Sequence, residues 1–270
     1  MPRAAAIVLA GGRSSRMGSP KAALDWHGCP LLGRVTGIVA RAVDGPVIVV
    51  RAPGQELPEL DPAVEVVADP VEGRGPLQGL AAGLRAVGRR APVAYLSSTD
   101  VPLLHPAFVR CVLGAWRDAA DIVLPEIGGH RQPLAAAYRV GLAPIVEQLV
   151  DGGRLKPAFL FERSRVVVLD EAAVRRDAAV ARDDPGLASV SDVNAPSDYE
   201  RARALPAPEI AVDGPGGETV RAWTLGELVR AFDRELPPGT AFTLNGQRVA
   251  SDPRFPLVAG DRVAFSPGPS

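Results

Sequence analysis

Residues 4–21 of the chain read AAAIVLAGGRSSRMGSPK. The unbroken apolar run of residues 4–10 predicts a fully buried strand. Gly11 and Gly12 then permit a sharp turn in which backbone N–H groups approach a ligand closely. Positive charges follow the turn at Arg13, Arg16 and Lys21. A strand, a glycine turn and basic residues in this order predict a site that binds phosphate groups.

This phosphate-binding stretch differs from two common nucleotide-binding motifs. A P-loop ends in Gly-Lys followed by Ser or Thr. A dinucleotide-binding fold carries the spacing G-x-G-x-x-G. Neither pattern occurs between Leu9 and Lys21, so both classes of site are excluded there.

The composition limits the class of protein further. A chain of 270 residues predicts one or two domains, and its apolar fraction of 47% can form a sizeable core. A net charge of −1 gives no electrostatic reason to expect nucleic-acid binding. Cys29 and Cys111 are too few for a disulfide framework or a cysteine-based zinc site, so we expect a reduced, cytoplasmic setting.

The chain is not expected to bind or cross a membrane. The apolar run of residues 4–10 has only Arg3 before it and leads directly into the phosphate motif, unlike a signal peptide. No apolar run approaches the roughly 18–20 residues that span a bilayer.

Strand and helix patterns alternate after Lys21, which predicts a doubly wound, mostly parallel α/β sheet. The expected strands are 47–50, 63–68, 93–96, 122–124 and 165–169, and the expected helices are 31–43, 80–87, 106–115, 142–150 and 197–204. Ser197 is the expected N-cap of the last helix. Ligands bind outside the carboxyl ends of strands in such sheets. The loops after Ala10, Ala68 and Leu96 should therefore form one site.

Four segments lie in or near these loops, and each has an ordinary structural reading beside the functional role that a family resemblance, given next, implies. Asp100 follows a buried strand, where a carboxylate suits a divalent cation or closes a turn before Pro102. Asp69 forms an Asp-Pro turn, or contacts the nucleotide as the resemblance implies. Residues 75–79, GPLQG, begin a helix, or line a base pocket as the resemblance implies. Asn194 caps a helix, or contacts a substrate or metal as the resemblance implies.

Residues 9–24, LAGGRSSRMGSPKAAL, resemble the signature of the MobA-like nucleotidyltransferases, which attach a nucleotide to the molybdenum cofactor. The family pattern is LAGG or LAAG, then S-x-R-M-G, two residues and Lys, and every position is filled. The resemblance implies a Rossmann-like nucleotidyltransferase fold over residues 1–204. It also implies Mg²⁺-dependent transfer of GMP from GTP to the phosphate of molybdopterin or the molybdenum cofactor, with release of pyrophosphate.

The resemblance also implies a role for individual residues. Lys21 and Arg16 would hold the triphosphate, and Asp100 would hold Mg²⁺. The nucleotide would be bound by Leu9, Ala10, Gly11, Gly12, Arg13, Lys21, Asp69, Gly75, Pro76, Leu77, Gly79 and Asn194. In the family, LAGG with GPLxG accompanies guanylyl transfer, whereas LAAG with a Ser-containing loop accompanies cytidylyl transfer. The residues 132–134, QPL, resemble a loop facing the acceptor, and His130 beside them is either a base or a surface histidine.

The last part of the chain changes character after the linker 205–208. Strands at 209–212 and 219–223 predict a hairpin, Thr224 and Glu227 predict a capping box for a helix at 225–235, and strands follow at 242–245, 248–249 and 262–265. The segments TLGELVRAF, LNGQRV and LVAGDRVAFSP resemble the MoaD/ThiS-like sulfur carriers of molybdopterin and thiamine synthesis. The resemblance implies a small α+β β-grasp domain over residues 209–270.

Sulfur carriers of this kind work through a C-terminal Gly-Gly, whereas residues 266–270 read SPGPS. We therefore expect this domain to stabilise the chain or to dock proteins of molybdenum cofactor synthesis or molybdoenzymes. Two alternatives to the guanylyltransferase remain. One is a transferase of the same fold that uses CTP or another phosphorylated acceptor. The other is a non-catalytic nucleotide-binding or docking protein.

Overall fold

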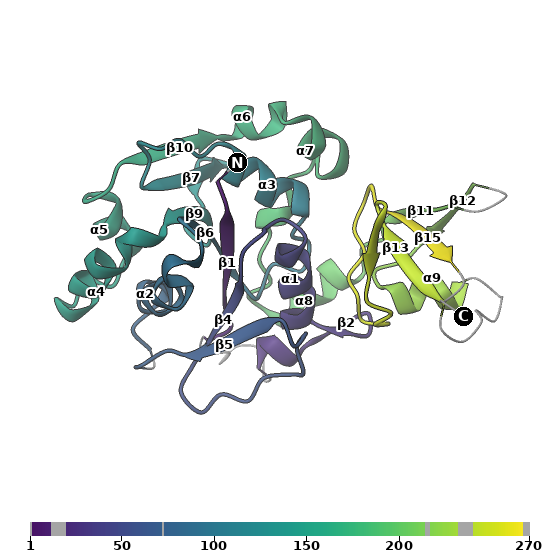
Figure 1. Cartoon of the computed structure of the whole chain (residues 1–270), viewed down its shortest axis with the longest axis horizontal. Coiled ribbons are helices and arrows are strands. Elements are labelled where there is room, and N and C mark those ends of the chain that lie inside the picture. The colour runs from purple at the N-terminus through teal and green to yellow at the C-terminus, as the bar shows by residue number, and fades with distance from the viewer. Residues whose placement is uncertain (1, 12–19, 72, 214–216, 232–239, 267–270) are drawn as a thin grey trace.

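An eight-stranded sheet forms the centre of the N-terminal part of the chain (Figure 1). The computed structural model describes residues 2–11, 20–71, 73–213, 217–231 and 240–266. The strands of the sheet are β1 (Ala4–Leu9), β4 (Val47–Arg51), β5 (Val64–Ala68), β6 (Val93–Ser98), β7 (Ile122–Ile127), β8 (His130–Arg131), β9 (Ala135–Arg139) and β10 (Val166–Asp170). Their order is β10-β7-β9-β6-β1-β4-β5, with β8 paired to β7.

The sheet is rich in parallel pairs but not uniformly parallel. β1 lies parallel to both β4 and β6, and β4 lies parallel to β5. β9 runs antiparallel to β6 and to β7, so it inverts the direction at the middle of the sheet. The sequence pattern did not predict β9, because its residues 135–139, AAAYR, have few β-branched or aromatic side chains.

Helices cover both faces of the sheet, as the doubly wound pattern predicts. They are α1 (Leu31–Ala40), α2 (Pro76–Val87), α3 (Pro106–Gly114), α4 (Ala143–Asp151), α5 (Pro157–Phe161), α6 (Glu171–Arg176), α7 (Ala178–Asp183) and α8 (Pro196–Arg203), with 3₁₀ turns at Lys21–Ala23, Gly88–Arg90, Val140–Leu142 and Ala188–Val190. Alternate residues of β1 enter different cores: Val8 packs with α1 and α3, and Ile7 packs with α2 and α4. The strand is thus buried on both sides, as its apolar run predicts.

Two helices begin earlier than the sequence pattern predicts. α2 begins at Pro76 instead of residue 80, because Gly75 takes a positive φ of 75° at the N-cap and Pro76 fits the first helical position. α8 begins at Pro196 with Ala195 at its N-cap, so the prediction of Ser197 as N-cap is wrong. The Asp198 carboxylate accepts the backbone N–H of Ala195 at 3.0 Å instead.

The C-terminal sheet is a separate five-stranded layer of order β12-β11-β15-β13-β14. Its elements are β11 (Glu209–Asp213), β12 (Glu218–Arg221), α9 (Leu225–Ala231), β13 (Ala241–Leu244), β14 (Gln247–Val249) and β15 (Arg262–Ser266). The predicted cap at Thr224 is confirmed, since its Oγ1 accepts the Glu227 N–H at 3.3 Å. The Glu227 carboxylate accepts a hydrogen bond from the N–H of Trp223. A complete capping box would use the N–H of the N-cap residue itself, Thr224, which is the next residue along the chain.

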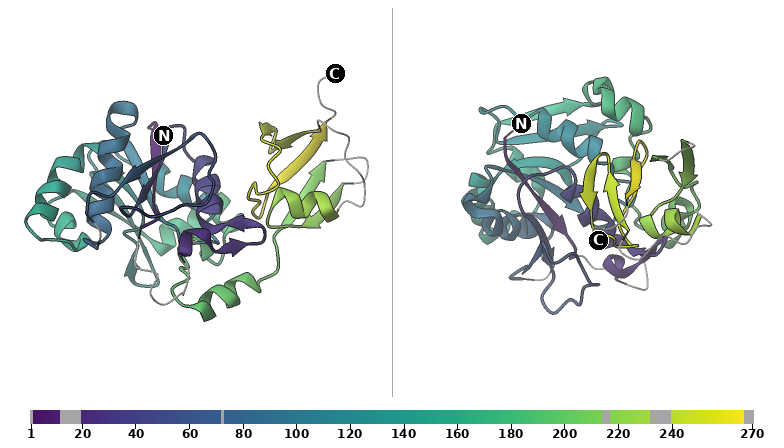
Figure 2. Two further views of the ribbon diagram at one scale, coloured as in Figure 1. Left: turned by 90° about the horizontal axis from the view of Figure 1, so that it is seen from below. Right: turned by 45° about the vertical axis from the view of Figure 1, so that its right-hand side comes forward.

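The C-terminal sheet lies beside α1 and the short hairpin β2 (Asp25–Trp26) and β3 (Cys29–Pro30), as Figure 2 shows. Its own core includes Ile210, Leu228 and Phe242. No helix in the described part of the chain is long and apolar enough to span a bilayer.

Candidate active site

The carboxyl ends of the central strands line up along one edge of the sheet. Leu9 of β1 is in register with Ser98 of β6 and with Val50 of β4, and Val50 is in register with Val67 of β5. The distance from β6 to β5 is three strand spacings, or about 14 Å. The predicted loops after β1, β5 and β6 therefore share one edge, wide enough for an extended nucleotide.

Lys21, Asp100 and Asn194 meet at this edge although they lie far apart in the sequence. The Lys21 ammonium lies 2.8 Å from Asp100 Oδ2 and donates to Asn194 Oδ1 at 3.0 Å. The side chains of Lys21 and Asp100 are 20% and 19% exposed, so the ion pair is partly screened from water and still open to a ligand. The structure therefore brings together three residues that the sequence assigned to phosphate, metal and substrate contacts.

The loop that carries Asn194 is tied to the strand that carries Asp100. The Val193 N–H donates to the Asp100 carbonyl at 2.8 Å. Asn194 Nδ2 donates to Asp192 Oδ2 at 2.7 Å, which places a second carboxylate beside the site. Of the segment 192–194, DVN, only Asn194 is assigned a role from the sequence, and Asp192 is assigned none. The two Asx residues on either side of the buried Val193 are the signal that points to Asp192 as well.

The start of the phosphate loop is held on both sides of β1. Thr99 Oγ1 donates to the Leu9 carbonyl at 2.8 Å, and Gln55 Nε2 donates to the Ala10 carbonyl at 3.0 Å. A Cβ at Gly11 would lie 3.2 Å from the backbone nitrogen of Ala52, so this position favours glycine. The backbone that enters the loop is therefore fixed. Gly12, Arg13 and Arg16 lie outside the described residues.

Asp69 lies at the end of β5 and faces the first turn of α2. Burial raises the pKa of its carboxyl group, opposed by hydrogen bonds from the Val71 N–H and from the Gln78 side chain. Gln78 is buried, and its Oε1 has no hydrogen-bond partner among the described residues. We did not select Gln78 from the sequence, although it is the polar side chain of the GPLQG segment.

The segment 75–79 brings the N-terminus of α2 to the same edge. Gly79 lets the helix contact β1 closely, because a Cβ there would lie 2.9 Å from Leu9 Cδ2. Residues 76–79 form the first turn. Pro76 has no N–H, so the N–H groups of Leu77, Gln78 and Gly79 carry the positive end of the helix dipole. The Leu77 side chain is buried in the core, so only its backbone remains to contact a nucleotide.

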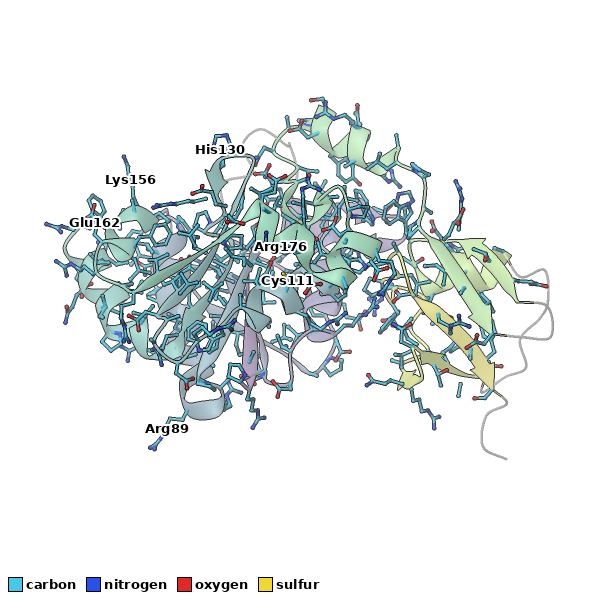
Figure 3. The ribbon with its side chains drawn as sticks, turned by 90° about the horizontal axis from the view of Figure 1, so that it is seen from above. Arg89, Cys111, His130, Lys156, Glu162 and Arg176 are labelled. Carbon is cyan, nitrogen blue, oxygen red and sulfur yellow. The ribbon has the colours of Figure 1, made fainter. Side chains whose placement is uncertain are left out.

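The described residues contain no group of three or more His, Cys, Asp or Glu side chains that could hold a metal ion by itself. The side-chain oxygens of Asp100, Asn194 and Asp192 lie at this edge and could serve as metal ligands. His130 is exposed in β8, at the outer end of a hairpin (Figure 3). The surface alternative therefore describes His130 better than a role as a base.

Comparisons with known proteins agree with this geometry. The family described as "MobA-like NTP transferase domain" matches residues 6–167. A Mycobacterium avium protein named "Probable molybdenum cofactor guanylyltransferase" is 37% identical over 174 residues, which cover 62% of this chain and 86% of the relative.

Solved structures share the fold. That of molybdopterin-guanine dinucleotide biosynthesis protein A from Archaeoglobus fulgidus has a TM-score of 0.59 at 22% identity and covers 74% of this chain and 96% of that one. A Mycobacterium tuberculosis protein in complex with manganese has a TM-score of 0.50 at 20% identity, covering 74% and 97% of the two chains. Because the family match extends over more than half of the residues and includes the strands that carry the loops described above, the chain belongs to the family of MobA-like NTP transferase domains.

Proposed function

We propose that the protein transfers GMP from GTP to the phosphate of molybdopterin or the molybdenum cofactor and releases pyrophosphate. The convergence of Lys21, Asp100 and Asn194 beside the glycine turn after β1 carries the proposal. This arrangement offers a cation for phosphate, a carboxylate for a metal ion and an amide for a substrate on one edge. The name of the Mycobacterium avium relative supports the same activity.

The donor set fits a divalent cation such as Mg²⁺. Asp100 and Asp192 offer carboxylate oxygens and Asn194 offers an amide oxygen, all of them hard ligands. Mg²⁺ commonly binds one or two carboxylates together with substrate phosphates, which agrees with a site that has no larger acidic cluster among the described residues. Asp100 would hold the ion, and the ion would neutralise charge on the triphosphate and on the leaving pyrophosphate.

The chain's own residues would act by positioning. An oxygen of the acceptor phosphate forms the new bond to the α-phosphorus of GTP, and the bond from that phosphorus to the pyrophosphate oxygen breaks. A phosphate monoester is already a nucleophile at neutral pH, so no histidine base is required. Lys21 would hold the triphosphate, and the fixed backbone of Leu9 to Gly11 would orient it for in-line attack.

The segment 75–79 supports GTP over CTP. Gly75 has a backbone conformation that favours glycine, and the position of its missing Cβ is open, with only the Leu155 carbonyl oxygen at 3.8 Å. Gly79 lets α2 pack closely on Leu9 of β1, which brings this loop to the edge where the base would lie. Asp69 and Gln78 add polar groups on the same side of the sheet.

We propose further that residues 1–204 form the transferase domain and residues 209–270 a β-grasp domain. The order of the C-terminal sheet supports this assignment. β11 and β15 pair in parallel, β12 pairs with β11 and β14 with β13 as antiparallel hairpins, and α9 follows the first hairpin and precedes the second in the chain. A cytoplasmic location and contacts of this domain with proteins of cofactor synthesis or molybdoenzymes belong to the same proposal.

The proposal is tested with the full chain, Mg²⁺, a molybdopterin phosphate acceptor and a panel of GTP, CTP and ATP. We expect pyrophosphate release with GTP alone and its loss when EDTA removes the metal. Release with CTP would identify a same-fold transferase of different specificity. If calorimetry shows that neither GTP nor CTP binds, the transferase proposal is wrong.

A further inference from the structure

Arg34 of α1 joins the active-site edge to the C-terminal sheet. Its side chain is fully buried, with 1% of the residue exposed. Nε donates to the carbonyl of Pro102 at 2.5 Å, and Nη1 and Nη2 donate to the carbonyls of Trp223 and Leu257 at 3.2 and 3.5 Å. Pro102 follows Asp100 by two residues, whereas Trp223 and Leu257 belong to the C-terminal unit. One guanidinium therefore connects the loop of the catalytic carboxylate to the other unit.

Two tryptophans enclose this guanidinium. Arg34 Cζ lies 5.0 Å from the Trp223 ring centroid and 5.8 Å from that of Trp26, within the range of cation–π attraction. The two indoles meet edge to face at 5.3 Å. Trp26 is fully buried and follows the 3₁₀ turn that begins at Lys21. Trp223 thus supports the segment that carries the phosphate-binding lysine.

The segment around Asn194 packs into the same cluster as Trp223. Val193 is buried in one apolar cluster with Trp26, Leu31 and Trp223. Val193 lies between Asp192 and Asn194, and its N–H donates to the Asp100 carbonyl. The orientation of Asn194 therefore depends on a cluster that Trp223 completes.

We propose that the C-terminal unit is a built-in clamp that holds Lys21, Asp100 and Asn194 in their active arrangement, with Arg34 and Trp223 as positioning residues. The clamp acts through three segments at once, because the segments after Lys21, after Asp100 and around Asn194 all rest on the Arg34–Trp223 contact. Both positioning residues are buried among protein groups, with 1% of Arg34 and 7% of Trp223 exposed, so they act through other residues. The effect on turnover rests on the proposed function, whereas the effect on the three segments does not.

The chain offers a matched pair of substitutions at this contact. Gly33 and Gly37 both lie in α1, one helical turn apart. A Cβ at Gly37 would lie 2.8 Å from Pro256 Cγ of the C-terminal unit, so something must shift. A Cβ at Gly33 would lie 3.4 Å from Cys29 Sγ, which is ordinary contact. Gly37→Ala thus pushes the clamp away from α1, and Gly33→Ala makes the same chemical change without doing so.

The first test measures amide hydrogen exchange of the full chain without nucleotide. In Trp223→Ala we expect exchange in residues 99–104 and 192–195 to become at least about tenfold faster while β1 is unchanged. Trp223→Phe keeps an aromatic ring and should stay within about threefold of the wild type. Gly37→Ala should speed exchange in the same two segments, and Gly33→Ala should not.

The second test measures GTP turnover against Mg²⁺ concentration. A clamp that positions Asp100 and Asn194 predicts that Trp223→Ala raises the Mg²⁺ concentration at half-maximal rate about threefold or more. A mere loss of folded protein lowers the rate without moving that concentration.

If amide exchange in residues 99–104 and 192–195 is unchanged in Trp223→Ala, the clamp proposal is wrong. The C-terminal unit would then be attached to the transferase part without affecting its active-site segments. If Trp223→Ala does not fold, the comparison of Gly37→Ala with Gly33→Ala decides, and equal exchange in those two variants refutes the proposal. If the wild type turns over no nucleotide, the proposed function fails, and the exchange measurements still support or refute the clamp.

Discussion

Gly79→Ala is the substitution that most directly tests how α2 positions the nucleotide loop. Gly79 faces the end of β1, and an added Cβ would lie 2.9 Å from Leu9 Cδ2 and 3.5 Å from Leu9 Cδ1. The carbonyl of Leu9 is held by the Thr99 hydroxyl at 2.8 Å, and the next residues begin the phosphate loop. We predict that the shift of the Leu9 side chain is passed on to its backbone, which we propose to contact GTP.

The size of the effect follows from the overlap. A Cβ at 2.9 Å lies about 0.5 Å inside the 3.4 Å at which ordinary contact begins. Misplacing reacting groups by 1 Å can lower a rate about 100-fold. If the activation free energy rises in proportion to the displacement, a shift of about 0.5 Å lowers the rate about tenfold. The gain of about 1 kcal/mol in helix propensity offsets the strain. We therefore expect kcat/KM for GTP to fall about tenfold while the unfolding free energy changes by less than about 1 kcal/mol.

Steady-state pyrophosphate release gives kcat/KM, and calorimetry gives the affinity for GTP. Gly33→Ala is the control, because its Cβ makes only a 3.4 Å contact with Cys29 Sγ and should leave kcat/KM within about twofold. If Gly79→Ala binds and turns over GTP as the wild type does, Leu9 gives way without moving the loop. The inference that α2 positions the loop through Gly79 is then refuted.

Asp100→Asn should lower GTP turnover at least about 100-fold, while GTP affinity measured in EDTA changes little, because the amide cannot supply the charge that holds the cation. Burial lowers the pKa of His105 below its ordinary 6.5. The unfolded chain then takes up the proton first, so the unfolding free energy should fall as the pH drops below about 6.5. His105→Gln should flatten this dependence in urea titrations. Arg41→Ala leaves the Asp261 carboxylate buried without its guanidinium partner. Urea unfolding should show a loss of about 3 kcal/mol.

Local patterns predicted the elements that carry the site. The run of residues 4–10 is apolar on both faces, which only a central strand requires, and it is β1. Parallel strands align their carboxyl ends, so the order of the elements along the chain is enough to assign the loops of Leu9, Asp69 and Asp100 to one edge. The elements that were not predicted have sequences with weak strand or helix propensity or with turn-forming residues. β9 is rich in alanine, and the start of α2 was obscured by Gly75 and Pro76, which also occur in turns.

The Arg34 contact could not be predicted, because its partners are distant in the sequence. An arginine at position 34 on a helix predicts an exposed side chain. Its burial requires carbonyls from Pro102, Trp223 and Leu257, which only the folded chain brings together. Burial lowers the pKa of Arg34 to about 10, so the guanidinium stays charged at neutral pH and keeps its donors for those carbonyls.

The energetics of this contact bear on how the two units behave. Trp223 and Val258 come from the C-terminal unit, yet they are buried in clusters formed with residues of the transferase part. Exposing these two side chains would cost about 3–6 kcal/mol, which keeps an undocked state below about 1% of the population. A substitution at Trp223 that slows turnover several-fold without separating the units would therefore act on the geometry of docked molecules. The loops around Trp223 and Leu257, and not the strands of the C-terminal sheet, make these contacts, so the proposed clamp acts on Lys21, Asp100 and Asn194 in nearly every molecule.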